Sequence, residues 1–348
     1  MDYSQKKELN NTHSQTMLSR VRGCFLAGAC GDALGYVVEF SDDSMIRSKY
    51  GKDGITQMDL IGGVAEVSDD TQMDIYTAQG IIHAAEKNCD YEGMVKEIYH
   101  SYLRWYCGQR HKPLPSELGE DDLITDEESK RLQQSRAPGI TCLTALASGR
   151  MGCPDCILND SKGCGGVMRA APAGVYYYKE PEKAYQLGCD LAFITHCHPL
   201  GYQSAGALAM IIAFILQGLA IDESVSRVIA FLREKGCKEM AACLQNAVNV
   251  AAKGPEYVNA LSFLGQGWVG DEAVAIAVWA ALVYPKDLKA AVVKAANHSG
   301  DSDSTGAVCG YIVGAALGEE AIPKEWLEHL ELKSILVSQA EKLVSLVQ

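Results

Sequence analysis

Alternating apolar and polar residues, the pattern of a half-buried β-strand, are almost absent from this sequence. Only the runs IIAFIL and VYYY have β-like composition, and strands do not alternate with helices along the chain. From Met17 onward, apolar residues instead recur at helical spacing. The sequence therefore predicts an all-α protein with one compact domain over residues 17–348, preceded by a mobile polar tail over residues 1–16.

Basic residues are also scarce relative to acids. The 348-residue chain has 31 lysines and arginines against 44 acids, a formal net charge of −13. Nucleic acids and anionic membranes bind basic patches, so this balance argues against both as partners.

A signal peptide and a membrane span are not indicated either. The polar N-terminus has no apolar signal-peptide core. The longest apolar run, residues 205–219, is shorter than the ~20 residues of a membrane span, and we expect it to be a buried core helix. We therefore expect a cytoplasmic monomer with no membrane or nucleic-acid partner, whose 13 cysteines are reduced.

A long polar stretch, residues 108–135, interrupts the helical pattern. It is rich in acids and contains Pro113 and Pro115. A loop of this length is typical of a surface lid or a disordered insert. Beyond Pro181 the pattern is almost wholly helical. The helices expected there are 184–194, 201–219, 223–235, 238–252, 272–283, 287–297, 307–317 and 326–346.

Two acidic clusters are present, at residues 68–71 (SDDT) and 301–305 (DSDST), each just before an expected helix. Ser, Thr and Asp are ordinary helix N-caps, so a cap alone is one interpretation. The helix dipole offsets only ~0.3–1 kcal/mol per charge, too little for paired carboxylates. A hard divalent cation resolves that repulsion better. If the clusters meet in space, they could hold two metal ions about 3.5–4 Å apart.

Other interpretations of the second cluster fail on spacing. An EF-hand that began at Asp301 would need an acid at its twelfth position, which is Ile312. A phosphatase of the haloacid-dehalogenase type needs its DxD after an apolar strand, whereas Ala-Asn-His-Ser-Gly precedes this one.

Two further motifs are weak by themselves. GCGGVMR, residues 163–169, leaves backbone N–H groups free to meet a phosphate, but it lacks the Walker A and dinucleotide-binding spacings and a flexible turn is the simpler interpretation. THCHP contains His196 and His198, and histidines in an apolar neighbourhood are more often core residues than metal ligands.

In their order along the chain, GDALG…VVEF, VSDDTQM, RAPG, SKGCGGVMR, THCHP, GWVGDEA and HSGDSDSTG resemble the ADP-ribosylglycohydrolase family. The resemblance extends from Arg22 to about Trp326 and is closest to bacterial ADP-ribosylarginine hydrolases and the dinitrogenase-reductase-activating glycohydrolase. It implies an orthogonal all-α domain that uses two Mg²⁺ or Mn²⁺ ions to cleave ADP-ribose from modified side chains.

The resemblance also implies roles for individual residues. Glu39 matches the acid near the reacting sugar carbon, Asp32 supports the metal site from behind, and Asp303 bridges the two ions. The metal ligands implied are Ser68, Asp69, Asp70, Asp301, Asp303 and Ser304. The ligand-binding positions implied are Gly163, Gly165, Gly166, Val167, Met168, His198, Trp268 and Val269. This chain departs from many relatives at Cys164 and Gly166, where they have Asn and Ser or Ala, and residues 108–135 match no role.

The expected function is that of a dimetal hydrolase acting on mono-ADP-ribosylated protein, at the N-glycosidic bond to arginine. Glu39, Asp69, Asp70 and Asp303 are the catalytic candidates, and the residues do not decide which of the acids moves the proton. One alternative is a hydrolase of O-linked ADP-ribose, on serine or in O-acetyl-ADP-ribose. Another is a catalytically silent binder of ADP-ribose or of a partner protein.

Overall fold

The structure is a computed structural model that describes residues 3–255, 257 and 260–347. It confirms the all-α prediction, because its described part contains helices and isolated β-bridges but no strand. The α-helices are α1 (Tyr3–Tyr36), α2 (Asp43–Tyr50), α3 (Asp69–Glu86), α4 (Tyr91–Gln109), α5 (Ile140–Ala147), α6 (Ala171–Tyr176), α7 (Pro181–Phe193), α8 (Pro199–Leu216), α9 (Ile221–Glu234), α10 (Lys238–Ala251), α11 (Leu261–Leu264), α12 (Gly270–Val283), α13 (Leu288–Ala296), α14 (Ser302–Leu317), α15 (Lys324–Leu327) and α16 (Lys333–Val347).

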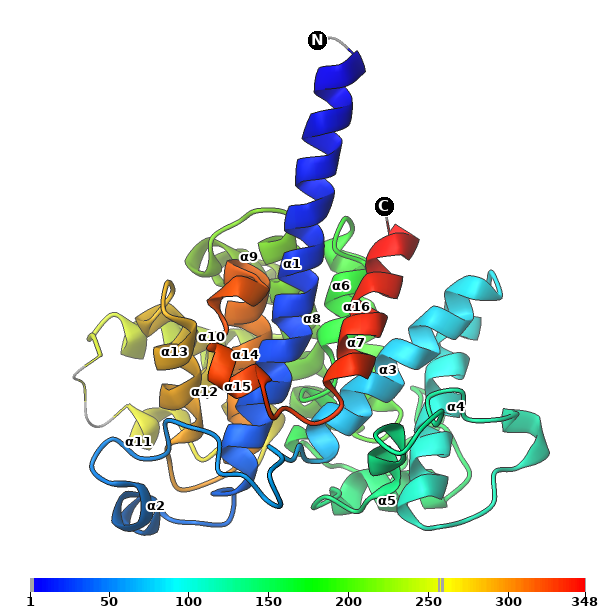
Figure 1. Ribbon diagram of the computed structural model, residues 1–348, viewed down its shortest axis with the longest axis horizontal. Coiled ribbons are helices and arrows are strands. Elements are labelled where there is room, and N and C mark those ends of the chain that lie inside the picture. The colour runs from blue at the N-terminus through cyan, green and yellow to red at the C-terminus, as the bar shows by residue number, and fades with distance from the viewer. Residues whose placement is uncertain (1–2, 256, 258–259, 348) are drawn as a thin grey trace.

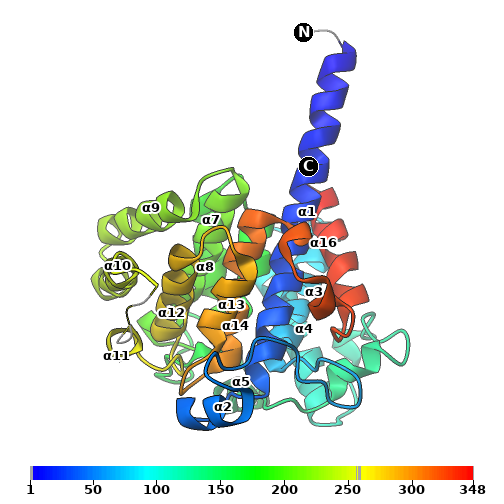
Figure 2. The ribbon, with the colours of Figure 1, turned by 60° about the vertical axis from the view of Figure 1, so that its left-hand side comes forward.

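Helices α1 and α14 form the centre of the fold, with α12, α13 and α16 beside them (Figures 1 and 2). Their contact is made by a small residue at every fourth position of each helix, which places these residues on one face. The facing pairs are Gly23–Gly314, Ala27–Gly310, Gly31–Gly306 and Gly35–Ser302. Residue numbers rise along one helix as they fall along the other, so the two helices are antiparallel and their backbones touch.

The helix α8 confirms the expected buried core helix at the apolar run. Among the described residues it is the helix long and apolar enough to cross a membrane, but 72% of it is buried inside the protein. Its small residues face α7, where a Cβ at Gly188 would lie 2.7 Å from the carbonyl oxygen of Ala205.

The segment predicted to be a polar tail, residues 1–16, is largely helical in the structure. The helix α1 begins at Tyr3, and its first half projects from the rest of the molecule (Figure 1). Residues 1–2 lie outside the described part of the chain, and the predicted mobility stays a prediction.

The polar stretch of residues 108–135 has a defined conformation with two short 3₁₀ turns. Its second half, residues 121–134, is hydrogen-bonded to α3. The Asp121 carboxylate accepts hydrogen bonds from Tyr76 and Gln79, and the carbonyl of Gln134 accepts one from Gln72 at 3.1 Å. Its acids therefore serve as acceptors for the polar side chains of α3.

Two expected helix boundaries were wrong. The helix expected over 326–346 is two helices, α15 and α16, because Leu332 between them has a positive φ of 57° that interrupts helical geometry. The helix expected to begin at 307 begins at Ser302, so the acidic cluster lies within its first turn.

We expect Gly310→Ala to lower the free energy of unfolding by about 2 kcal/mol or more, because its Cβ would lie 2.1 Å from the carbonyl oxygen of Ala27. Gly108→Ala in α4 is the matched control, since its Cβ would meet only the Gln133 side chain at 3.2 Å. The control should change stability by no more than about 1 kcal/mol. Urea unfolding of both variants measures this, and equal stabilities would contradict it.

Candidate active site

The two acidic clusters lie in the wall of one cavity of about 520 Å³. Asp69 and Asp70 come from the start of α3, Asp301 and Asp303 from the start of α14, and Glu39 from the turn after α1. Carboxylate oxygens of Glu39, Asp301 and Asp303 lie within 4.8 Å of one another. The structure thus brings together acids from three segments that are distant in sequence, near the end of the molecule at which α1 ends (Figure 1).

The buried carboxylate of Asp32 holds the start of α3 in place. This side chain accepts hydrogen bonds from the backbone N–H groups of Ser68 at 3.0 Å and Thr71 at 3.1 Å. Ser68 is the N-cap, and its hydroxyl accepts from the N–H of Asp70 at 3.1 Å. One oxygen of Asp69 accepts from the N–H of Gly139 at 3.0 Å. These bonds fix the direction in which Asp69 and Asp70 face.

The start of α14 is fixed by close backbone contacts. The N–H of Asp301 donates to the carbonyl of Gln266 at 2.9 Å. Gly300 precedes it with φ of 151°, and a Cβ there would lie 2.0 Å from that same carbonyl oxygen, so only glycine fits. On the other side, a Cβ at Gly35 of α1 would lie 2.4 Å from the backbone nitrogen of Asp303.

The acids destabilise one another when all are ionised. Burial, with a further contribution from the charge of Asp303, raises the pKa of Asp70 and Asp301 well above the ordinary range. Burial and then the charges of Asp303 and Asp301 raise the pKa of Glu39 to about 10. No lysine or arginine is among the described residues that line the cavity.

The oxygen atoms fit a hard cation. Asp70 Oδ2 and Glu39 Oε2 are buried and have no hydrogen-bond partner. Buried unpaired carboxylate oxygens are costly unless a proton or a cation satisfies them. Carboxylate and hydroxyl oxygens are the ligands that Mg²⁺ and Mn²⁺ prefer. The cluster therefore has the donor set of a divalent-metal site.

The glycine-rich segment forms another part of the cavity wall. Gly163, Cys164, Gly165 and Met168 line the cavity with His196 and Trp268. A Cβ at Gly165 would lie 2.8 Å from the ring of His196 and 2.9 Å from Cys142 Sγ, so glycine keeps this wall open. Burial, with the charge of Arg169, lowers the pKa of His196 to about 3, and its ring is therefore neutral.

The mouth of the cavity is apolar. Phe40 is 73% exposed, Ile140 is 82% exposed and Trp268 is 40% exposed, and all three line the cavity. The rings of Phe40 and Trp268 are stacked with centroids 6.0 Å apart. Exposed large apolar side chains that gather at a cavity are typical of a contact surface for a ligand. The acids thus lie below an apolar rim.

Several predicted site residues do not line this cavity. Gly166 packs against Ala192, and Val167 is fully buried in the core. Val269 forms an isolated β-bridge with Gly163. Ser68 serves as the cap described above.

His198, predicted to lie near the ligand, is not among the residues that line this cavity. Its Nδ1 accepts from the N–H of Leu200 at 3.1 Å and caps α8. The histidine of THCHP that faces the cavity is His196. Spacing could not choose between the two, because the turn that precedes α8 decides which ring points inward.

Sequence patterns also missed part of the site. Phe40, Cys164, His196 and residues 137–142 were not predicted as site residues, although the structure places them in the wall. The motif RAPG ends at Gly139, which bonds Asp69, and was the available signal for that segment.

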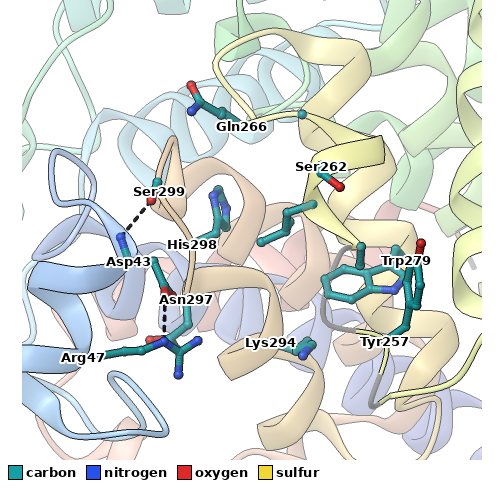
Figure 3. Close-up of a pocket in the computed structure, with 13 residues that line it drawn as sticks. Asp43, Arg47, Tyr257, Ser262, Gln266, Trp279, Lys294, Asn297, His298 and Ser299 are labelled. Carbon is teal, nitrogen blue, oxygen red and sulfur yellow. Dashed lines mark hydrogen bonds and ion pairs between the residues drawn. The ribbon is translucent and has the colours of Figure 1, made fainter.

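A second cavity, of about 630 Å³, lies beside the segment that leads into Asp301 (Figure 3). It is lined by Asn297, His298 and Ser299 with Trp279 and Lys294. Asp43, the one carboxylate among the described residues that line it, is ion-paired with Arg47 at 2.8 Å. This cavity therefore lacks the converging acids of the first, and the first is the candidate active site.

Known proteins similar to this one match it over nearly the whole chain. A sequence profile of the ADP-ribosylglycohydrolase family matches residues 13–348. The chain is similar to the ADP-ribosylarginine hydrolase Tri1 of Serratia proteamaculans, with 24% identity over 334 residues that cover 94% of this chain and 79% of that protein. It is also 24% identical to the ADP-ribosyl-(dinitrogen reductase) glycohydrolase of Rhodospirillum rubrum, over 90% of this chain and 91% of that protein.

A solved structure, an ADP-ribosylglycohydrolase-related protein complex, has the same fold. Its TM-score is 0.67 at 23% sequence identity, and the match covers 96% of this chain and 100% of that chain.

We expect the metal-free protein to lose stability as the pH rises from about 5 to 8. The pKa of Asp32 is raised from 3.8 to about 7, first by burial and then by Asp303. Above pH 4 the folded protein therefore holds protons that the unfolded chain has released, and it loses this advantage as the pH rises through the folded pKa. Thermal unfolding in EDTA across this range measures the effect.

Asp303→Asn should flatten this pH dependence, because Asp303 contributes to the raised pKa of Asp32, Glu39, Asp70 and Asp301. A wild-type midpoint that is constant from pH 5 to 8 in EDTA would contradict the prediction.

Proposed function

The chain belongs to the ADP-ribosylglycohydrolase family, and on this premise we propose that it is a dimetal-dependent hydrolase of mono-ADP-ribosylated protein. The bond proposed is the N-glycosidic bond between ADP-ribose and an arginine side chain. The observation that carries the proposal is the buried cluster of Glu39, Asp301 and Asp303 beside Asp69 and Asp70, which has unpaired oxygens and no basic neighbour in the cavity wall.

Two Mg²⁺ or Mn²⁺ ions are the proposed cofactors. Their ligands would come from both acidic clusters: Ser68, Asp69, Asp70, Asp301, Asp303 and Ser304. When bound, such ions supply Lewis-acid activation of water and orientation of the ribose hydroxyls. Asp303 follows the N-cap of α14, and its charge acts on the acids of both clusters, which favours it as the residue shared by the two ions.

Glu39 is our candidate for proton transfer. Its carboxylate lies within reach of Asp301 and Asp303, and one of its oxygens has no partner. It could take a proton from water or give one to the leaving group, and Asp69 and Asp70 stay alternatives. Cleavage of a glycosidic bond builds positive charge on the sugar, which the surrounding carboxylates would stabilise.

The glycine-rich wall is proposed to bind the diphosphate of ADP-ribose. Gly163, Gly165 and Met168 line the same cavity as the acids, and Trp268 stands at its mouth. A Cβ at Gly165 would collide with His196, so that ring can pack against this backbone only because the residue is glycine.

Arginine is favoured over serine as the acceptor by charge. The guanidinium of a modified arginine is cationic, whereas a serine linkage is neutral, and the described wall of the cavity has acids but no lysine or arginine. The name of one relative above, an ADP-ribosylarginine hydrolase, points the same way.

We expect Asp303→Asn to reduce ADP-ribose release by at least about 10²-fold, because it removes the carboxylate that we propose the two metal ions share. The circular dichroism spectrum should not change. Asp155→Asn, at an exposed acid outside the cavity, is the matched control and should keep full activity. A fully active Asp303→Asn protein would contradict the proposal.

The choice of linkage is tested by release of ADP-ribose from arginine-modified and serine-modified protein. We expect release from arginine, its loss in EDTA and its return when Mg²⁺ is added. Release from serine alone would favour the O-linked alternative. Calorimetric binding of ADP-ribose with no release from either acceptor would favour a silent binder.

A further inference from the structure

A buried carboxylate lies behind the acidic cluster, outside the cavity wall. Glu331 precedes α16 and its side chain is 2% exposed. It accepts a hydrogen bond from the N–H of Val67 at 3.0 Å. It also forms ion pairs with Arg131 at 3.1 Å and Arg136 at 3.4 Å. A buried charge with three donors is fully compensated and fixes the positions of those donors.

Backbone bonds connect the segment around Glu331 to the chain that leads into α3. The N–H of Ala65 donates to the carbonyl of His329 at 2.9 Å, and the N–H of Glu331 donates to the carbonyl of Ala65 at 3.1 Å. Ala65 and Leu330 thereby form a parallel β-bridge. The C-terminal part of the chain therefore positions residues 65–67, which immediately precede the N-cap Ser68.

The second chain segment held by Glu331 also leads to Asp69. The carbonyl of Arg136 accepts the N–H of Asp69 at 3.0 Å, and Gly139, three residues on, donates to the Asp69 carboxylate at 3.0 Å. The Arg136 side chain pairs with Glu66 at 2.8 Å as well as with Glu331. Both segments that meet at Asp69 are thus anchored to one carboxylate.

We propose that Glu331 is a positioning residue for the metal site, which acts through Val67 and Arg136 to hold Asp69 and Asp70 in their ligand geometry. The inference rests on the proposed dimetal function. Groups that orient metal ligands typically change metal affinity by about 10–100-fold when they are removed. Asp69 and Asp70 lie close to several other carboxylates that repel them, so hydrogen bonds from the surrounding chain are needed to keep them in place more than for isolated ligands.

The test is Mn²⁺ binding to the full-length protein, measured by calorimetry for wild type and Glu331→Gln. Glutamine keeps the size of the side chain and can still accept from Val67, but it loses both ion pairs. We expect the Kd for Mn²⁺ to rise about tenfold. The unfolding midpoint in EDTA should fall, because both ion pairs of a buried carboxylate are lost, and kcat at saturating Mn²⁺ should return towards the wild-type value.

Glu97→Gln is the matched control, because Glu97 is also partly buried and ion-paired, with Lys87 at 2.8 Å, but lies on α4 away from the acids. Its Mn²⁺ affinity should equal that of wild type. Arg131→Gln is a milder second variant, since Arg131 is 34% exposed and supplies one of the two ion pairs. We expect its Kd to rise in the same direction by about threefold.

A wild-type Kd in Glu331→Gln would overturn the inference while leaving the proposed function standing. If Glu331→Gln does not fold, a wild-type Kd in Arg131→Gln would overturn it. Failure of the wild-type protein itself to bind Mn²⁺ would overturn the proposed dimetal function, and this inference with it.

Discussion

The close approach of α1 and α14 determines where Glu39, Asp301 and Asp303 of the candidate site lie. A Cβ at Gly31 would lie 2.1 Å from the carbonyl oxygen of Gly306, and one at Gly35 would lie 2.2 Å from that of Ser302. Such backbone contact requires that at least one residue of each facing pair is a glycine, which has no side chain. At the end of this contact α1 turns into Glu39 and α14 begins with Asp301 and Asp303. The same helix contact that packs the core therefore also sets the distances between these carboxylates.

That constraint forces like charges together, and the surrounding structure offsets only part of the cost. Asp32 is satisfied by the N–H groups of Ser68 and Thr71, and Asp69 by the N–H of Gly139. Glu39 and Asp70 each retain an oxygen with no partner. A fold selected for stability alone would place apolar side chains at such buried positions. The retained acids are thus best explained by what they bind.

Helical spacing was enough to predict the all-α fold, because amphipathic periodicity depends on local sequence. The meeting of the two acidic clusters was stated only as a condition, since it depends on an antiparallel helix contact between distant segments. His198 was chosen over His196 for the same reason: a two-residue spacing does not reveal which ring a turn directs inward. The length of the polar stretch 108–135 suggested a lid or a disordered insert, because the sequence does not show that Asp121 bonds Tyr76 and Gln79 of α3 or that the carbonyl of Gln134 accepts from Gln72.

Helix capping and metal binding do not exclude one another in the acidic clusters, because a carboxylate that caps a helix with one oxygen can still offer its other oxygen to a metal ion. Asp301 accepts the N–H of Ser304 with one oxygen, and Ser68 caps α3 while Asp69 and Asp70 face the cavity. A helix N-terminus favours negative charge and supplies N–H donors, so it lowers the cost of assembling carboxylates there. Two helix starts directed at one cavity can therefore hold more acids than either could hold alone. This explains why the acids occur as clusters at two caps, in place of single ligands spread along the helices.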